Sequence, residues 1–293
     1  MRLRGVQERR PVTPPRSGIA FALSGGGSHG AAQVGMLRAL FEAGVVPDAL
    51  VGCSVGALNA TYVAADPTAE RVAALAEIWS TMTARTVFGT PRRATVWNLV
   101  TRRDHLFTPD RLMALIDRLC PVPDLADLAV PTHVVTTDLD AGRPTWWTAG
   151  PARRILAASA CLPALFPPVS LPGPDGGVRR HVDGGVAASV PVARAASLGV
   201  RTVYVLDVSG EHAGAASHMT ALEVLLRSFT ISRYANLPDP VDMAGPGQEV
   251  VVLPCPDIAA IGIRDFRSTA SMMTAAYELA AGFLAGRVPM TAA

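Results

Sequence analysis

The stretch Ala49-Leu50-Val51-Gly52-Cys53-Ser54-Val55-Gly56-Ala57-Leu58-Asn59-Ala60 has the pentapeptide Gly-x-Ser-x-Gly at its centre. An apolar run leads into the pentapeptide, and a helix-forming run leads out of it. A strand, a tight turn and a helix in this order hold a serine on a strained elbow with its hydroxyl exposed. The sequence therefore predicts that Ser54 is a nucleophile.

The two glycines of the pentapeptide, Gly52 and Gly56, have a steric task in this interpretation. Because they lack side chains, they let the chain reverse sharply and let the first helical turn approach the strand. The N-terminus of that helix would then present backbone N–H groups, including that of Val55, to negative charge that develops beside Ser54.

A glycine-rich loop, Ser24-Gly25-Gly26-Gly27-Ser28-His29-Gly30, joins an apolar run at residues 18–23 to a helical run that ends near Ala43. The apolar run is expected to be a buried first strand. Consecutive glycines expose their N–H groups, so we interpret the loop as an anion site and, together with the elbow, as an oxyanion hole. Its predicted donors are the amides of Gly25, Gly26, Gly27 and Val55.

The same loop permits a second interpretation, because Gly25, Gly27 and Gly30 satisfy the pattern G-x-G-x-x-G. Asp48 follows 18 residues after the last of these glycines, which is close to the spacing of a dinucleotide fingerprint. An NAD(P)-dependent oxidoreductase is therefore an alternative. Two features weaken it: the ribose-binding acid belongs at the end of the second strand, whereas Asp48 precedes that strand, and the elbow occupies the end.

Size and composition favour one domain. The chain has 293 residues, of which 49% are hydrophobic, and we expect a single domain over residues 18–293 after a disordered, Arg- and Pro-rich lead at residues 1–17.

The formal net charge of +2 gives no reason to expect a nucleic-acid partner. Four cysteines without a C-x-x-C pair give no reason to expect a zinc site or a disulfide framework, and we therefore expect a cytoplasmic location. No apolar run reaches 18 residues, so only peripheral contact with membranes stays open.

Alternating strands and helices predict an α/β layered fold with a largely parallel sheet. Further strands are expected at residues 131–138, 143–148, 179–182, 201–208 and 249–253. Helices are expected at residues 57–65, 68–84, 109–119, 152–160, 191–198, 221–234 and 268–284.

Two segments have a less regular pattern. The prolines at 163, 167 and 168 predict a rigid, extended segment through Phe166. Residues 85–108 interleave aromatic residues with arginines, and we expect a partly buried cap there, with a segment at a lipid interface as the alternative.

A second candidate for chemistry is Asp183, in the run His181-Val182-Asp183-Gly184-Gly185-Val186. The paired glycines, Gly184 and Gly185, allow the aspartate to lie in a cramped turn after a short strand. An Asp-Gly pair usually marks a plain turn. In this chain it has a candidate partner in Ser54.

Four motifs, taken in order, resemble the patatin-like phospholipases. They are the glycine loop 25–30, the elbow 52–56, the block Ala158-Ser159-Ala160-Cys161-Leu162-Pro163-Ala164-Leu165-Phe166-Pro167-Pro168, and Asp183-Gly184-Gly185. The resemblance covers roughly residues 18–208. It implies a three-layer α/β/α fold and hydrolysis of lipid acyl esters by a Ser–Asp dyad, with no metal, no cofactor and no catalytic histidine.

Carried over to this chain, the resemblance implies that Ser54 is the nucleophile, Asp183 the base, and Gly25 to Gly27 the oxyanion hole. One position departs from the family, which usually has Arg or Lys where His29 stands. A histidine can hold the loop or an anionic head group through its charge only when it is protonated.

A carboxylate is a weak base at its reference pKa of about 4, so we expect partial burial to raise the proton affinity of Asp183. A Ser–His–Asp triad is an alternative, because Asp207 with His212 or His218 follows the serine in the chain order of α/β-hydrolases. A non-enzymatic lipid-surface module built on residues 85–108 is another. Candidates for lining an acyl channel are Trp97, Trp146, Trp147, Leu162 and Phe166.

Overall fold

The structure is a computed structural model that describes residues 18–89, 104–173, 176–208, 238–258 and 260–287, together with Val224, Ser228 and Ile231. The lead expected at residues 1–17 lies outside the described residues. So do most of the cap expected at 85–108 and most of the helix expected at 221–234.

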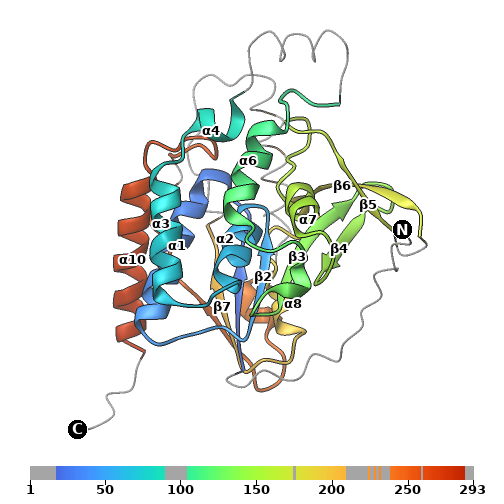
Figure 1. The fold of residues 1–293 in the computed structure, drawn as a ribbon. Helices are drawn as coiled ribbons and strands as arrows, with labels where there is room; N and C mark the ends of the chain where they lie inside the picture. The colour runs from blue at the N-terminus through green and yellow to red at the C-terminus, as the bar shows by residue number, and fades with distance from the viewer. Residues whose placement is uncertain are drawn as a thin grey trace.

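Within the described residues, eight strands form one mixed sheet in the order β5-β6-β3-β2-β1-β7-β8, with β4 also paired to β3 (Figure 1). The strands are β1 (Ile19–Leu23), β2 (Ala49–Cys53), β3 (Thr132–Asp138), β4 (Arg143–Trp147), β5 (Val169–Pro172), β6 (Val178–Asp183), β7 (Thr202–Leu206) and β8 (Glu249–Val252). The neighbours in the run β3-β2-β1-β7-β8 pair in parallel. The pairings that involve β4, β5 and β6 are antiparallel. The largely parallel sheet is therefore confirmed.

Helices cover both faces of this sheet. They are α1 (Gly30–Glu42), α2 (Val55–Ala64), α3 (Ala69–Ser80), α4 (Ala84–Phe88), α6 (Asp110–Leu119), α7 (Ala152–Ser159), α8 (Val192–Ala196) and α10 (Thr269–Ala285), with short 3-10 turns η1 (Gly27–His29), η2 (Leu125–Asp127), η3 (Gly184–Val186) and η4 (Pro240–Met243).

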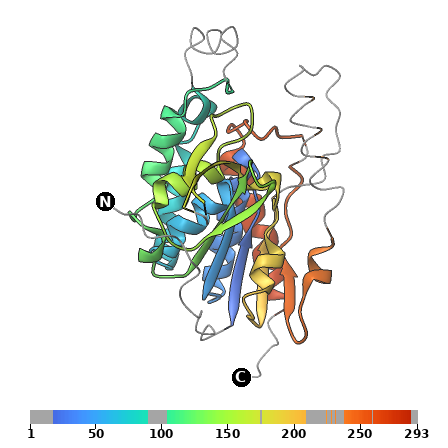
Figure 2. The ribbon, with the colours of Figure 1, turned by 90° about the vertical axis from the view of Figure 1, so that its right-hand side faces the viewer.

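The two faces of the sheet have different neighbours because side chains alternate along each strand. Phe21 and Leu23 of β1 belong to the large apolar cluster shared with α1, α2, α3, α7 and α10. Ala20 and Ala22 belong to a smaller cluster that includes α8. Figure 2 shows the strands between these layers. The three-layer α/β/α arrangement is thereby confirmed, with one layer much larger than the other.

The proline-rich segment differs from its prediction. The amides of Leu165 and Phe166 both donate to the carbonyl of Leu162 at 3.1 Å, which closes a turn where an extended chain was expected. Ala164, between the prolines, has φ 65°. A proline fixes its own φ and restricts the residue before it, but it leaves the residue after it free to turn. Strand β5, which follows at Val169, was not predicted.

Two helical glycines provide a matched pair of substitutions. A Cβ at Gly56 would lie 2.5 Å from the carbonyl oxygens of Leu23 and Ser24, which are backbone atoms, whereas a Cβ at Gly282 would have nothing within 4 Å. We expect Gly56→Ala to lower the free energy of unfolding by about 3 kcal/mol or more. Gly282→Ala in α10 should raise it by about 0.5–1 kcal/mol. Urea denaturation measures both, and equal effects of the two substitutions would contradict the packing described.

His133 on β3 should make the fold sensitive to acid. It is 2% exposed, and Arg194 donates through Nε to its Nδ1 at 3.3 Å. Burial, and secondarily the charge of Arg194, lowers the pKa of His133 from about 6.5 to about 4. The unfolded chain binds the proton of His133 more tightly than the folded chain does. The contribution of the neutral, buried His133 to stability is therefore complete above the pKa of the unfolded state. It is lost as the pH falls from there through the pKa of the folded state.

We expect the free energy of unfolding to fall by on the order of 3 kcal/mol from this residue between pH 7 and pH 4. Urea denaturation at a series of pH values measures the slope. His133→Gln should flatten the slope below pH 6.5. An unchanged slope in that variant would show that other groups dominate the acid response.

Candidate active site

Ser54 and Asp183 meet because two strands run toward each other along one edge of β3. Strand β4 pairs with the opposite edge. On the shared edge, the parallel strand β2 ends with Cys53 opposite Val135, and the antiparallel strand β6 ends with Asp183 opposite Thr136. The carboxyl ends of β2 and β6 therefore face neighbouring residues of β3, and the chain turns away from the sheet at both.

The turn after β2 has the geometry expected of an elbow. Ser54 has φ 53° and ψ −123°, a region that side-chain-bearing residues rarely adopt and that costs about 1–3 kcal/mol. A Cβ at Gly52 would lie 2.5 Å from the Cα of Ala57, so only glycine permits helix α2 to begin this close to β2. The strained serine is consequently held in place by the packing around it.

The Ser54 hydroxyl donates a hydrogen bond of 2.6 Å to Oδ2 of Asp183. The other carboxylate oxygen, Oδ1, accepts the amide hydrogen of Gly185 at 2.7 Å. Asp183 is fully buried and Ser54 is 8% exposed, so the aspartate is more deeply buried than the partial burial expected. One oxygen is thus fixed by the backbone, and the other faces the hydroxyl.

Two further side chains, which sequence reasoning missed, hold the pair in position. The amide of Ser54 donates to Oγ of Ser159 at 3.0 Å, and Oγ1 of Thr137 donates to the carbonyl of Asp183 at 2.9 Å. The Asp183 amide donates to the carbonyl of Cys161 at 2.9 Å. The sequence contained no signal for these bonds, since a serine at the end of a helix and a threonine in a strand are ordinary residues in both places.

The glycine loop lies beside the hydroxyl, but its amides are not equivalent. Gly25 donates its N–H to the carbonyl of Ser189 at 3.0 Å, so this amide hydrogen already has an acceptor within the protein. For Gly26, Gly27 and Val55, no acceptor for the amide hydrogen is found among the described residues. Gly27 and Val55 line the same cavity as the serine.

The remaining motif glycines are required by close approaches. A Cβ at Gly27, which has φ 59°, would lie 2.4 Å from the carbonyl oxygen of Ile263. A Cβ at Gly30 would lie 2.4 Å from Cγ2 of Val55, and one at Gly184 would lie 2.4 Å from the carbonyl oxygen of Val135. These close contacts explain why glycine occupies these positions in the loop and in the turn after β6.

His29 does not face the site. It is 1% exposed, and its Nε2 donates to the carbonyl of Ile261 at 2.7 Å. Burial lowers its pKa, although hydrogen bonds to backbone carbonyls oppose the shift. Its neighbour Ser28 donates to the carbonyls of Gly262 (Oγ, 3.0 Å) and Ile263 (N, 2.9 Å). His29 is therefore buried against backbone carbonyls, and its bond holds the loop to residues 261–263.

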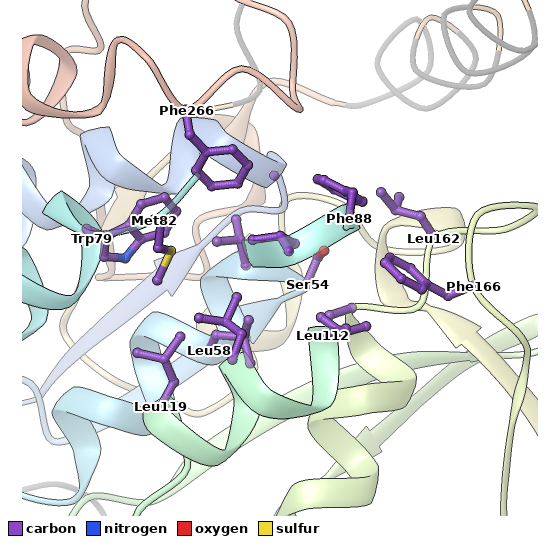
Figure 3. A pocket seen from close by; sticks show the side chains of 15 residues that line it. Ser54, Leu58, Trp79, Met82, Phe88, Leu112, Leu119, Leu162, Phe166 and Phe266 are labelled. Carbon is purple, nitrogen blue, oxygen red and sulfur yellow. The ribbon is translucent and has the colours of Figure 1, made fainter. Parts of the chain in front are cut away.

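An apolar cavity of about 50 Å³ opens at Ser54 (Figure 3). Two of the candidate channel residues, Leu162 and Phe166, line it. Trp147 does not, because its indole N–H donates to Oγ1 of Thr136 in the core, and Trp146 packs in the smaller cluster near Arg194. Trp97 lies outside the described residues. The other lining residues, most of them in helices α2, α3, α4 and α6, were not predicted: Leu58, Trp79, Met82, Val87, Phe88, Leu112, Leu115, Leu119, Ala160 and Phe266.

The structure bears differently on the two alternative sites, the dinucleotide site and the Ser–His–Asp triad. Asp48 accepts the amide hydrogen of Ile19 at 3.0 Å, at the start of β1, whereas the glycine loop follows the end of β1. A carboxylate at the opposite end of the strand cannot bind the ribose of a dinucleotide on the loop, so that interpretation is contradicted. For the triad, His212 and His218 lie outside the described residues, and the serine hydroxyl donates to Asp183.

No helix in the described part of the chain combines the length and apolar character needed to cross a bilayer.

The sequence matches a family model described as patatin-like phospholipase over residues 21–196. It is 30% identical over 190 residues to patatin-like phospholipase domain-containing protein 7 of Rattus norvegicus, covering 65% of this chain and 13% of that protein. It is 28% identical over 207 residues to an uncharacterised NTE family protein of Mycobacterium tuberculosis, covering 71% of this chain and 53% of the relative. The chain thus spans only part of the length of these relatives.

Among solved structures, VipD from Legionella pneumophila aligns with a TM-score of 0.46 at 12% sequence identity, over 93% of this chain and 67% of VipD.

Removing the hydroxyl of Ser159 should slow the reaction of Ser54 with a fluorophosphonate probe. In Ser159→Ala the Ser54 amide loses its acceptor, which weakens the elbow by roughly 1–3 kcal/mol, and we expect labelling to slow by about 10-fold. Time courses of labelling measure this. Ser271→Ala, on the exposed face of α10, is the control and should label at the normal rate. Equal rates in both variants would rule out a positioning role for Ser159.

Proposed function

The chain belongs to the patatin-like phospholipase family, and we propose that it is an enzyme that hydrolyses acyl esters of lipids through a dyad of Ser54 and Asp183. The observation that carries the proposal is the 2.6 Å hydrogen bond between the serine hydroxyl and the buried carboxylate, beside an apolar cavity. Described residues from Phe21 to Leu284 share one apolar cluster, which supports a single domain over residues 18–293.

In the proposed reaction, Oγ of Ser54 attacks the ester carbonyl while its proton moves to Oδ2 of Asp183. The tetrahedral intermediate collapses, the alcohol leaves with that proton, and an acyl-serine is formed. Water then attacks the acyl-serine, and Asp183 takes the proton of the water and returns it to the serine. The amide of Gly185 keeps Oδ1 fixed, so the same oxygen serves as the base in both halves.

The negative charge of the intermediate needs hydrogen-bond donors that are already in place. We assign this task to the amides of Gly26, Gly27 and Val55, because Gly27 and Val55 line the cavity at the serine and Gly26 adjoins them in the loop. Each well-aligned donor is worth about 10²–10³ in rate in other serine hydrolases. Gly25 is left out because its amide is already donated to Ser189.

The cavity is suited to an acyl chain by its chemistry, since leucines, phenylalanines, Trp79 and Met82 surround it. Its volume of about 50 Å³ holds only a few water molecules, so a long chain enters only when lining side chains move. A lipid substrate would reach the site from a lipid surface, and peripheral membrane contact is part of this proposal.

Substitution of the dyad tests the proposal. We expect Ser54→Ala to abolish both ester hydrolysis and labelling by a fluorophosphonate. Asp183→Asn should lower kcat by about 10³-fold, because the amide keeps the bond to Gly185 but cannot accept a proton. Hydrolysis of a lysophospholipid, with the melting temperature as a measure of folding, checks both. Asp117→Asn, at an exposed carboxylate paired with Arg153, is the control and should retain activity. Near-normal turnover by Asp183→Asn would exclude the dyad.

A further inference from the structure

Arg264, for which the described residues offer no ion-pair partner, lies next to an aromatic residue that lines the proposed acyl cavity. The guanidinium carbon of Arg264 lies 5.2 Å from the ring centroid of Phe88 and 5.3 Å from that of Phe107. Phe88 lines the cavity together with Ser54, and it stacks on Phe166 with centroids 5.8 Å apart. Figure 3 shows Phe88 and Phe166 on the same side of the serine. The charge of Arg264 therefore lies against an aromatic group that borders the site.

The backbone fixes this position. Ile263, the residue before Arg264, accepts the amide hydrogen of Ser28 at 2.9 Å, and its carbonyl packs against Gly27. His29 is bonded to Ile261 at 2.7 Å. The segment that carries Arg264 is thus hydrogen-bonded to the glycine loop, and the Arg264 side chain contacts Phe88, which lines the cavity.

Arg264 is also available to a ligand. It is exposed, and among the described residues no carboxylate forms an ion pair with it. Its neighbour Asp265 is instead paired with Arg267 at 2.6 Å. Contact with two ring faces orients a guanidinium but uses none of its N–H groups, which remain free for an anion with two or more oxygens.

Among the described residues, no side chain that lines the cavity carries a charge, and Arg264 lies behind the lining residue Phe88. The glycine loop offers only amides, and His29, where a cation would have been expected, is buried against backbone carbonyls. Within the described part of the chain, a preference between charged and neutral esters would therefore come from a charged residue next to this lining.

We propose that Arg264 is a specificity-determining residue, which selects ester substrates that carry an anionic oxygen group, such as a phosphate, close to the scissile carbonyl. This inference rests on the hydrolase function proposed above. The acyl chain occupies the apolar cavity, and the anionic group of the same molecule binds the guanidinium through paired N–H···O contacts. The arginine touches the substrate but takes no part in the proton transfers.

The test compares two substrates that differ only in the phosphate: 1-octanoylglycerol and 1-octanoylglycerol 3-phosphate, both as dispersed monomers. Arg264→Gln should lower kcat/KM for the phosphate ester by about 10-fold, mainly through KM, and leave kcat/KM for the neutral ester within two-fold. Arg264→Lys should retain part of the preference. Arg267→Gln, three residues away and paired with Asp265, is the matched control and should behave as the wild type.

Added salt should weaken the preference of the wild type and leave Arg264→Gln unaffected. Equal losses on both esters in Arg264→Gln would show a structural role and overturn the proposal, as would no loss on either. Inorganic phosphate should not change hydrolysis of the neutral ester. A change that depends on Arg264 would instead mark a site for free anions. If the wild type hydrolyses neither ester and a fluorophosphonate does not label Ser54, the proposed hydrolase function itself fails.

Discussion

The hydrogen bond between the Ser54 hydroxyl and the Asp183 carboxylate depends on the way one strand edge is shared. Strands β2 and β6 approach from opposite directions along the same edge of β3 and stop at Val135 and Thr136. Because β4 occupies the other edge, β6 can pair only where β2 has ended. A shift of β6 by one residue would turn the carboxylate to the opposite face of the sheet. The register of two short strands thus sets the geometry of the site.

This arrangement places two energetically unfavourable features, a strained backbone and a buried carboxylate, side by side, and hydrogen bonds from neighbouring groups stabilise both. Ser54 occupies a strained backbone conformation, and Asp183 is a fully buried carboxylate. Hydrogen bonds hold each of them: the Ser54 amide donates to Ser159, the Gly185 amide donates to the Asp183 carboxylate, and the Thr137 hydroxyl donates to the Asp183 carbonyl. Strain and buried charge persist only where such contacts over-determine the local structure.

The segment after β8 connects the parts of the site. Its backbone carbonyls at residues 261–263 hold the glycine loop through Ser28 and His29. From the same segment, Phe266 lines the cavity and stacks on Trp79, and Arg264 lies against the ring of Phe88. A stretch that has no recognisable motif therefore supports the amides proposed to bind the oxyanion and supplies one wall of the proposed acyl site.

The sequence by itself determined the fold class, the elbow at Ser54, the glycine loop and the cramped turn after Asp183, since steric limits and apolar periodicity act between residues that are neighbours in the chain. Even the pairing of Ser54 with Asp183 was expected, although only through the order of the motifs. Tertiary structure alone decided that the Gly25 amide is occupied, that His29 is buried, that Leu162 to Phe166 turn, and which helices line the cavity. Hydrogen-bond partners and burial are fixed by residues far away in the chain, so no local pattern encodes them.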